Sequence, residues 1–158
     1  PRTDTLFLAR EVFDGTFGTD SSMQGKKKLL GDELELLKYK SPIVPEIKYK
    51  EWQFKAQLIK ADTLQGKHVW VVDIENPAQQ KITDYYDVDN GLRYKRFITD
   101  KQFLNKRIIQ YSQYQKENEN GILYPYLKVI SGPQTTIRMK IRDINYESKL
   151  DRKLFEIF

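Results

Sequence analysis

The segment from Lys67 to Phe97 constrains the fold more than any other, because it contains three strand-like runs separated by turn signals. The first run is rich in Val, Ile and Trp, which favour a pleated, partly buried surface. Pro77 ends it, since proline cannot donate to a β-ladder. Asn90-Gly91 is the strongest short-range signal for a hairpin turn. The segment therefore predicts an antiparallel meander with strands at Lys67–Ile74, Ile82–Val88 and Leu92–Ile98.

Alternating apolar and polar residues extend this pattern in both directions. The clearest case is Trp52–Leu64, which is expected to place Trp52, Phe54, Ala56 and Leu58 on one face. A Gln65-Gly66 turn leads into the next strand, whose two faces are both apolar, so that strand is expected near the centre of the sheet. Further strands are predicted at Thr5–Phe13, Thr16–Ser22, Asn105–Gln115, Ile122–Ile130 and Thr135–Tyr146, the last with a β-bulge at Asp143.

Helical signals are few. Gly31–Tyr39 is predicted to be a helix that Asp32 caps and that ends before Ser41-Pro42. Leu150–Phe158 is expected to form a closing helical turn over a sheet edge.

These elements predict a mainly β (α+β) fold. We expect one sequential antiparallel sheet of about eight or nine strands, which is enough for the sheet to curl and to leave a concave face. Residues 1–158 are expected to form a single domain. We also expect it to be truncated at its N-terminus, since the chain opens at Pro1 and enters a strand almost at once.

Charge and composition exclude several classes of protein. The 27 Lys and Arg residues are interspersed with 22 Asp and Glu, whereas nucleic-acid-binding proteins cluster their cations, so no nucleic-acid partner is expected. The absence of Cys excludes disulfides and thiolate metal sites. No apolar run reaches the roughly 18 residues of a membrane-spanning helix.

Residues that could support catalysis or bind a metal are few. His68 is the only histidine, which rules out a His-rich zinc site, and we interpret it as structural. Asp84, Asp87 and Asp89 form the densest carboxylate cluster, with Asp73 one strand away. Such a cluster could do acid–base work or bind Ca²⁺, but it lacks the spacing of an EF-hand. We interpret these residues as turn and edge carboxylates, and we predict no catalytic residue, no metal and no cofactor.

Two basic segments have a simple interpretation. Gly25–Lys28 could contact phosphate or an anionic membrane surface, but no phosphate-binding glycine motif is present, so we predict a solvated loop. Arg138, Lys140 and Arg142 alternate with apolar residues and are predicted to be the solvent face of a half-buried strand.

The concave apolar face is the more informative feature. The single predicted helix offers too few apolar residues to cover it. An uncovered face could hold an acyl chain, in which each buried CH₂ contributes about 0.8 kcal/mol. The residues predicted to line the ligand are Trp52, Phe54, Leu58, Trp70, Ile137, Met139 and Ile141.

Four segments, in order, resemble the outer-membrane lipoprotein carrier family, the LolA/LolB-like superfamily. They are GDELELLKYK, GKHVWVVDI, DYYDVDNGLRYKR and GPQTTIRMKIRDINYESKLDRKLF, and the most specific parts are residues 85–92 and 132–155. The resemblance implies an unclosed half-barrel with helices at its mouth and a hydrophobic cavity for lipid chains. It also implies no enzymatic activity and no metal.

Three hypotheses follow. The first is a non-enzymatic protein of the bacterial envelope, periplasmic or associated with the outer membrane, that binds a lipid, a lipoprotein acyl chain or another apolar ligand. The second is an interaction or scaffold domain of a larger envelope protein, such as one that carries a zinc-protease-like region, without a ligand. The third is a hydrolase or sugar-active enzyme that uses the carboxylates between Asp84 and Asp89. Peripheral contact with a membrane is compatible with the first.

Overall fold

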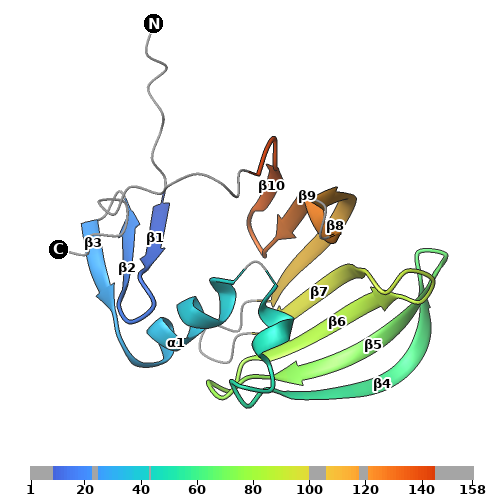
Figure 1. The fold of residues 1–158 in the computed structure, drawn as a ribbon, viewed down its shortest axis with the longest axis horizontal. Helices are drawn as coiled ribbons and strands as arrows, with labels where there is room; N and C mark the ends of the chain where they lie inside the picture. The colour runs from blue at the N-terminus through green and yellow to red at the C-terminus, as the bar shows by residue number, and fades with distance from the viewer. Residues whose placement is uncertain (1–8, 23–24, 43, 100–105, 118–120, 145–158) are drawn as a thin grey trace, which may run out of the picture. The chain divides into compact units, whose positions relative to one another are not determined.

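The computed structural model describes residues 9–22, 25–42, 44–99, 106–117 and 121–144 (Figure 1). The chain divides into two compact units, Pro1–Lys48 with Glu147–Phe158, and Tyr49–Tyr146. Within the described ranges, no helix has the length and apolar character needed to cross a membrane.

The first unit contains a small antiparallel sheet and two helical segments. The sheet has the order β1-β2-β3 and consists of β1 (Ala9–Phe13), β2 (Gly18–Ser22) and β3 (Gly25–Leu29). The helices are α1 (Gly31–Lys40) and the 3-10 helix η1 (Pro45–Lys48). The predicted turn between the first two strands is confirmed, because the Asp14 side chain accepts the amide N–H groups of Thr16 and Phe17 at 2.7 and 2.6 Å.

Helix α1 packs on one face of this sheet. Phe13, Gly18 and Leu29 are register partners and so share a face. A Cβ atom at Gly18 would lie 2.8 Å from Leu37 and 2.9 Å from Leu34, both on α1. Gly18 therefore lets the helix approach β2 closely.

Two predictions for the first unit are wrong. Gly25–Lys28 is not a loop but most of β3, because an exposed edge strand can pair its backbone while long lysine side chains reach water. Asp32 is not the helix cap. Leu30 occupies that position without a side-chain hydrogen bond, and Asp32 lies in the first turn, where a negative charge is favourable.

The second unit is a seven-stranded meander. Its strands are β4 (Lys55–Leu64), β5 (Lys67–Glu75), β6 (Lys81–Asp87), β7 (Arg93–Thr99), β8 (Lys106–Glu117), β9 (Ile122–Ser131) and β10 (Thr136–Lys140). Each strand pairs antiparallel with its neighbour in sequence, and β4 and β10 are the edges. The sheet bends strongly but does not close (Figure 1). The prediction of an unclosed, curved antiparallel sheet with short helices is thereby confirmed.

The organising meander of β5, β6 and β7 is confirmed in detail. Gln65 and Gly66 have φ values of 54° and 80° and form the two-residue turn into β5. The Asp87 amide donates to the Leu92 carbonyl at 2.9 Å, which closes the turn that contains Asn90-Gly91. β5 lies between β4 and β6, and it buries Val69 and Ile74 on opposite faces, as its sequence predicted.

Other expectations for the strands are corrected. The described strands form two sheets instead of one, because α1 and η1 interrupt the chain between β3 and β4. β4 begins at Lys55, because the Phe54 amide donates back to the Tyr49 carbonyl at 2.9 Å and Gln53 takes a left-handed φ of 58°. Trp52 and Phe54 therefore belong to a turn.

The last predicted strand is shorter than expected. β10 ends at Lys140, and residues 141–144 are outside any strand, so the bulge at Asp143 is wrong. Among the described strands, β10 has a partner on one side only, and its outer side has no paired strand to hold the chain extended. The predicted closing helical turn, Leu150–Phe158, lies outside the described residues.

Candidate functional site

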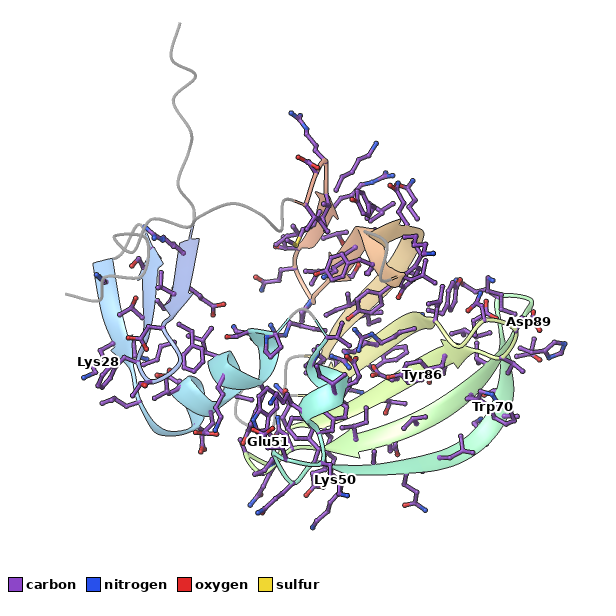
Figure 2. The ribbon with its side chains drawn as sticks, in the orientation of Figure 1. Lys28, Lys50, Glu51, Trp70, Tyr86 and Asp89 are labelled. Atoms are coloured by element: carbon purple, nitrogen blue, oxygen red, sulfur yellow. The ribbon has the colours of Figure 1, made fainter. Side chains whose placement is uncertain are left out.

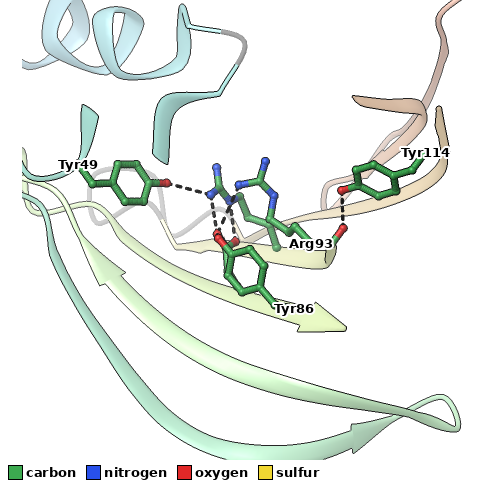
Figure 3. Close-up of polar contacts among 6 residues, drawn as sticks. Tyr49, Tyr86, Arg93 and Tyr114 are labelled. Atoms are coloured by element: carbon green, nitrogen blue, oxygen red, sulfur yellow. Dashed lines mark hydrogen bonds and ion pairs between the residues drawn. The ribbon is translucent and has the colours of Figure 1, made fainter. Parts of the chain in front are cut away.

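One row of side chains crosses all seven strands of the second unit. The cross-strand register links Leu58, Val72, Asp84, Arg96, Ile109, Ile130 and Ile137 in turn. Residues opposite each other in an antiparallel sheet project to the same face. We name this face, which carries Asp84, the inner face. Figure 3 shows Tyr49, Tyr86 and Arg93 on the inner side of the bend.

An ion pair lies at the centre of this otherwise apolar row. Asp84 is 0% exposed and accepts two hydrogen bonds from Arg96, from Nε at 2.7 Å and from Nη2 at 2.6 Å. Arg96 Nη2 also donates to the Tyr49 hydroxyl at 3.1 Å. The Tyr86 hydroxyl donates to Asp84 at 3.1 Å. Burial opposes the charge on Arg96, but the hydrogen bonds and charge of Asp84 outweigh it and raise the pKa of Arg96 well above its usual value.

A second guanidinium group stands beside this pair. Arg93 Nη1 lies 3.5 Å from Asp84 Oδ2, and the Arg93 guanidinium lies 4.5 Å from the centre of the Tyr111 ring. The Tyr114 hydroxyl donates to the Arg93 carbonyl at 2.7 Å (Figure 3). Among the residues that the structure describes, the cluster therefore contains two guanidinium cations and one carboxylate, which are largely shielded from water.

The interpretation of Asp84 as a turn or edge carboxylate is wrong. Asp84 stands between Ile82 and Tyr86 in the alternation of β6, and this phase directs its side chain to the inner face. Asp73 and Asp87 project to the other face, where Asp73 accepts from Thr83 at 2.7 Å. The carboxylates that the sequence suggested as an acid–base cluster therefore do not converge.

The cluster was missed although the sequence held a signal for it. The alternation Ile82, Asp84, Tyr86 places an acid in the apolar phase of its strand. A buried acid needs a cation opposite, and Arg96 lies on the return strand of the same hairpin. The register shift at Tyr85/Tyr86 then brings Arg93 opposite Tyr86.

Four of the seven predicted ligand-lining residues lie on the inner face and expose large apolar surface. Leu58 is 57% exposed, Trp70 41%, Ile137 53% and Met139 50%. Leu58 and Trp70 are on the neighbouring strands β4 and β5, and Trp70 is the direct partner of Tyr86 (Figure 2). Ile137 and Met139 are both on β10, at the opposite edge. The inner face therefore presents two apolar patches on either side of the buried ion pair.

The other three predicted residues lie outside the strands. Phe54 stacks on Tyr49 with ring centres 4.4 Å apart, and Trp52 lies 6.3 Å from Phe54. Because Tyr49 also accepts the hydrogen bond from Arg96, this turn is tied to the inner face. Ile141 follows β10 and donates its amide to the Tyr126 carbonyl at 2.9 Å.

Two hollows lie at the ends of the strands. The larger, about 860 Å³, is near the start of β4, and seven of its eleven lining residues are polar or charged, so it does not suit an acyl chain. The smaller, about 190 Å³, lies at the opposite strand ends and includes Arg93 and Tyr111 in its lining. Among the described residues, no group of three or more His, Cys, Asp or Glu could hold a metal ion.

No family model matches the chain, and no curated protein matches it in sequence. Solved structures with the same fold do exist. A domain named for outer membrane lipoprotein sorting, from Vibrio parahaemolyticus, is similar with a TM-score of 0.58 over 88% of this chain and 63% of that one. A DUF1329 family protein from Desulfovibrio piger has a TM-score of 0.62 over 94% and 66%. A LolA superfamily protein from Nitrosomonas europaea has a TM-score of 0.54 over 94% and 70%.

The chain has a LolA-like fold. Identity to each of the three structures is 12%, so the similarity establishes the fold alone. The chain spans 63% and 66% of the length of the first two structures. The resemblance that the sequence suggested is confirmed at the level of the fold.

Proposed function

We propose that this protein is a non-enzymatic component of the bacterial envelope that binds a lipid, a lipoprotein acyl chain or another apolar ligand on the inner face. The observation that carries the proposal is the exposure of Leu58, Trp70, Ile137 and Met139 on one face of a curved sheet. One of the structures with this fold is named for outer membrane lipoprotein sorting, which supports an envelope location, periplasmic or at the outer membrane.

The energetics favour an apolar ligand at these positions. Covering an exposed leucine or methionine side chain fully contributes about 1.5–3 kcal/mol. Large apolar side chains gathered on one face mark binding surfaces more often than single scattered ones do. The buried ion pair between the two patches is already satisfied by its own hydrogen bonds, so an acyl chain can pass over it without opening it.

A fluorescent fatty acid tests the proposal. Saturable binding to the purified chain is expected, and Leu58→Ser should weaken it by about threefold to tenfold, since part of the apolar contact is lost. Leu123→Ser is the matched control, because Leu123 is 45% exposed but alternates with the inner-face residues of β9. It should leave binding unchanged.

Two results would contradict the proposal: no uptake of the probe, or equal effects of Leu58→Ser and Leu123→Ser. No uptake, together with specific recovery of a protein partner from envelope extract, would favour the interaction or scaffold domain instead.

A further inference from the structure

The smaller hollow of the second unit differs in chemistry from the apolar patches. Its volume is about 190 Å³. Lys67 and Arg93 are the cations in its described lining and Asp87 is the carboxylate, while Tyr94, Tyr111 and Tyr114 supply rings. They come from the start of β5, the end of β6, the start of β7 and the middle of β8, so the sheet itself brings them together.

Aromatic rings hold both cations in place. Arg93 lies 4.5 Å from the centre of the Tyr111 ring, and Lys67 Nζ lies 5.8 Å from the centre of the Tyr94 ring. The Tyr94 hydroxyl donates to Gln65, and the Tyr114 hydroxyl donates to the Arg93 carbonyl at 2.7 Å. A pocket whose cations are positioned in this way loses little side-chain entropy when it takes an anion.

Asp87 does not cancel this positive character. Its Oδ2 accepts from Lys67 at 2.8 Å, and its Oδ1 accepts the Asp89 amide at 3.0 Å, so the backbone shares in neutralising the carboxylate. Lys67 has three ammonium protons, and 49% of its side chain is exposed, which leaves it able to bond to an anion as well.

The size of the pocket limits what can enter. At about 30 Å³ per water molecule, it holds roughly six waters, well below the roughly 300–1,000 Å³ of a pocket that encloses a whole drug-sized ligand. This volume is enough for a phosphate-sized group. Lys67 and Asp87 lie at the strand ends in the phase of the other face, whereas Arg93 belongs both to this pocket and to the inner-face cluster. A group held at these strand ends would therefore reach the inner face through Arg93.

We propose that Lys67 and Arg93 form a subsite for a phosphate-type anion, most simply the headgroup phosphate of a bound lipid. This inference rests on the proposed function, to which it adds the charge of the ligand. Arginine and lysine beside phosphate form charge-assisted hydrogen bonds, which are roughly twice as strong as neutral ones.

A matched pair of short-chain lipids tests the subsite. Binding of dihexanoyl phosphatidic acid and of dihexanoylglycerol is measured by calorimetry on the full chain, with inorganic phosphate as a third ligand. The phosphorylated lipid should bind about tenfold more tightly than the neutral one, and added salt should reduce that advantage. Lys67→Gln should remove most of the advantage without changing the affinity for the neutral lipid, and Lys67→Glu should remove all of it.

Lys106→Gln is the control, because Lys106 is exposed at the start of β8, where it pairs with Thr99, and is not part of the pocket. Arg93→Gln is a second variant, used once its circular dichroism spectrum shows that it folds.

Saturable binding of inorganic phosphate that Lys67→Gln abolishes would support the subsite with free phosphate as its source. Equal affinity for both lipids, or an advantage that survives Lys67→Glu, would overturn the subsite while the proposed function stands. Failure of both lipids to bind would instead count against the proposed function.

Discussion

At the scale of single residues, Asp84 determines how the centre of the sheet is built. A fully buried carboxylate is costly to desolvate, and it is tolerated here because Arg96 contacts both of its oxygens. Arg96 in turn bonds to Tyr49, and so the same pair holds the turn before β4. The ion pair thus ties β6, β7 and the turn before β4 together.

We predict that Asp84→Asn will be strongly destabilising. The substitution removes the charge opposite two guanidinium groups, and breaking a buried pair from one side costs about 3–5 kcal/mol. Urea unfolding measures this change as a shift of the midpoint. The double variant Asp84→Leu with Arg96→Met should recover part of the loss, because apolar replacements of a buried pair are often neutral but Arg93 also loses its carboxylate. A loss below about 1 kcal/mol in Asp84→Asn would contradict this description of the pair.

The Asp87–Lys67 pair predicts a pH dependence. Two hydrogen bonds lower the pKa of Asp87 below its ordinary 3.8. The larger effect comes from Lys67 and the next from the Asp89 amide. A lowered folded-state pKa means that the pair stabilises the fold above the unfolded pKa and that this contribution is lost as the pH falls through the folded value. Asp87→Asn should therefore be less stable than the parent at about pH 7, and the difference should shrink below about pH 3. Thermal unfolding at the two pH values measures it, and a difference that is independent of pH would exclude the pair as its source.

At the scale of elements, close packing of α1 on β2 shapes the first unit. Gly18 lies under Leu34 and Leu37, whose δ-methyl groups would have to shift to admit a Cβ atom. We predict that Gly18→Ala will lower stability by about 1–3 kcal/mol, the usual cost of overpacking. Ser21→Ala is the control, because Ser21 belongs to the other face of the same strand. Urea unfolding of both variants decides the matter: equal stabilities would mean that α1 does not depend on this contact.

Elements set by local signals could be predicted from the sequence. The turns at Gln65-Gly66 and Asn90-Gly91 and the strands that they join follow from neighbouring residues, and they are confirmed. The start of β4 and the end of β10 were not predicted. A left-handed residue at Gln53 overrides the alternation at β4, and β10 has no outer neighbour among the strands that the structure describes. The strand at Gly25–Lys28 was missed for a related reason, since its pairing partner decides its conformation.

At the scale of the whole molecule, the apolar patches and the buried ion pair lie on one surface, the inner face of the second unit. The apolar alternation correctly placed Leu58, Trp70, Ile137 and Met139 on one face. The ion pair between them could not be derived in the same way, because the pairing of Asp84 with Arg96 depends on the register shift at Tyr85/Tyr86 in the same hairpin. Whether these residues bind a ligand stays a prediction.

Fluorescence quenching shows whether an acyl chain bound to the inner face touches Trp70. The chain has two tryptophans, so Trp52→Phe leaves Trp70 as the only indole. Brominated fatty acids quench tryptophan fluorescence on contact, whereas the unbrominated acid does not. We expect saturable quenching of Trp70 fluorescence by the brominated acid. The unbrominated acid should instead cause a blue shift, because it covers the indole, which is 41% exposed without a ligand. Binding of the fatty acid without quenching of Trp70 would contradict it.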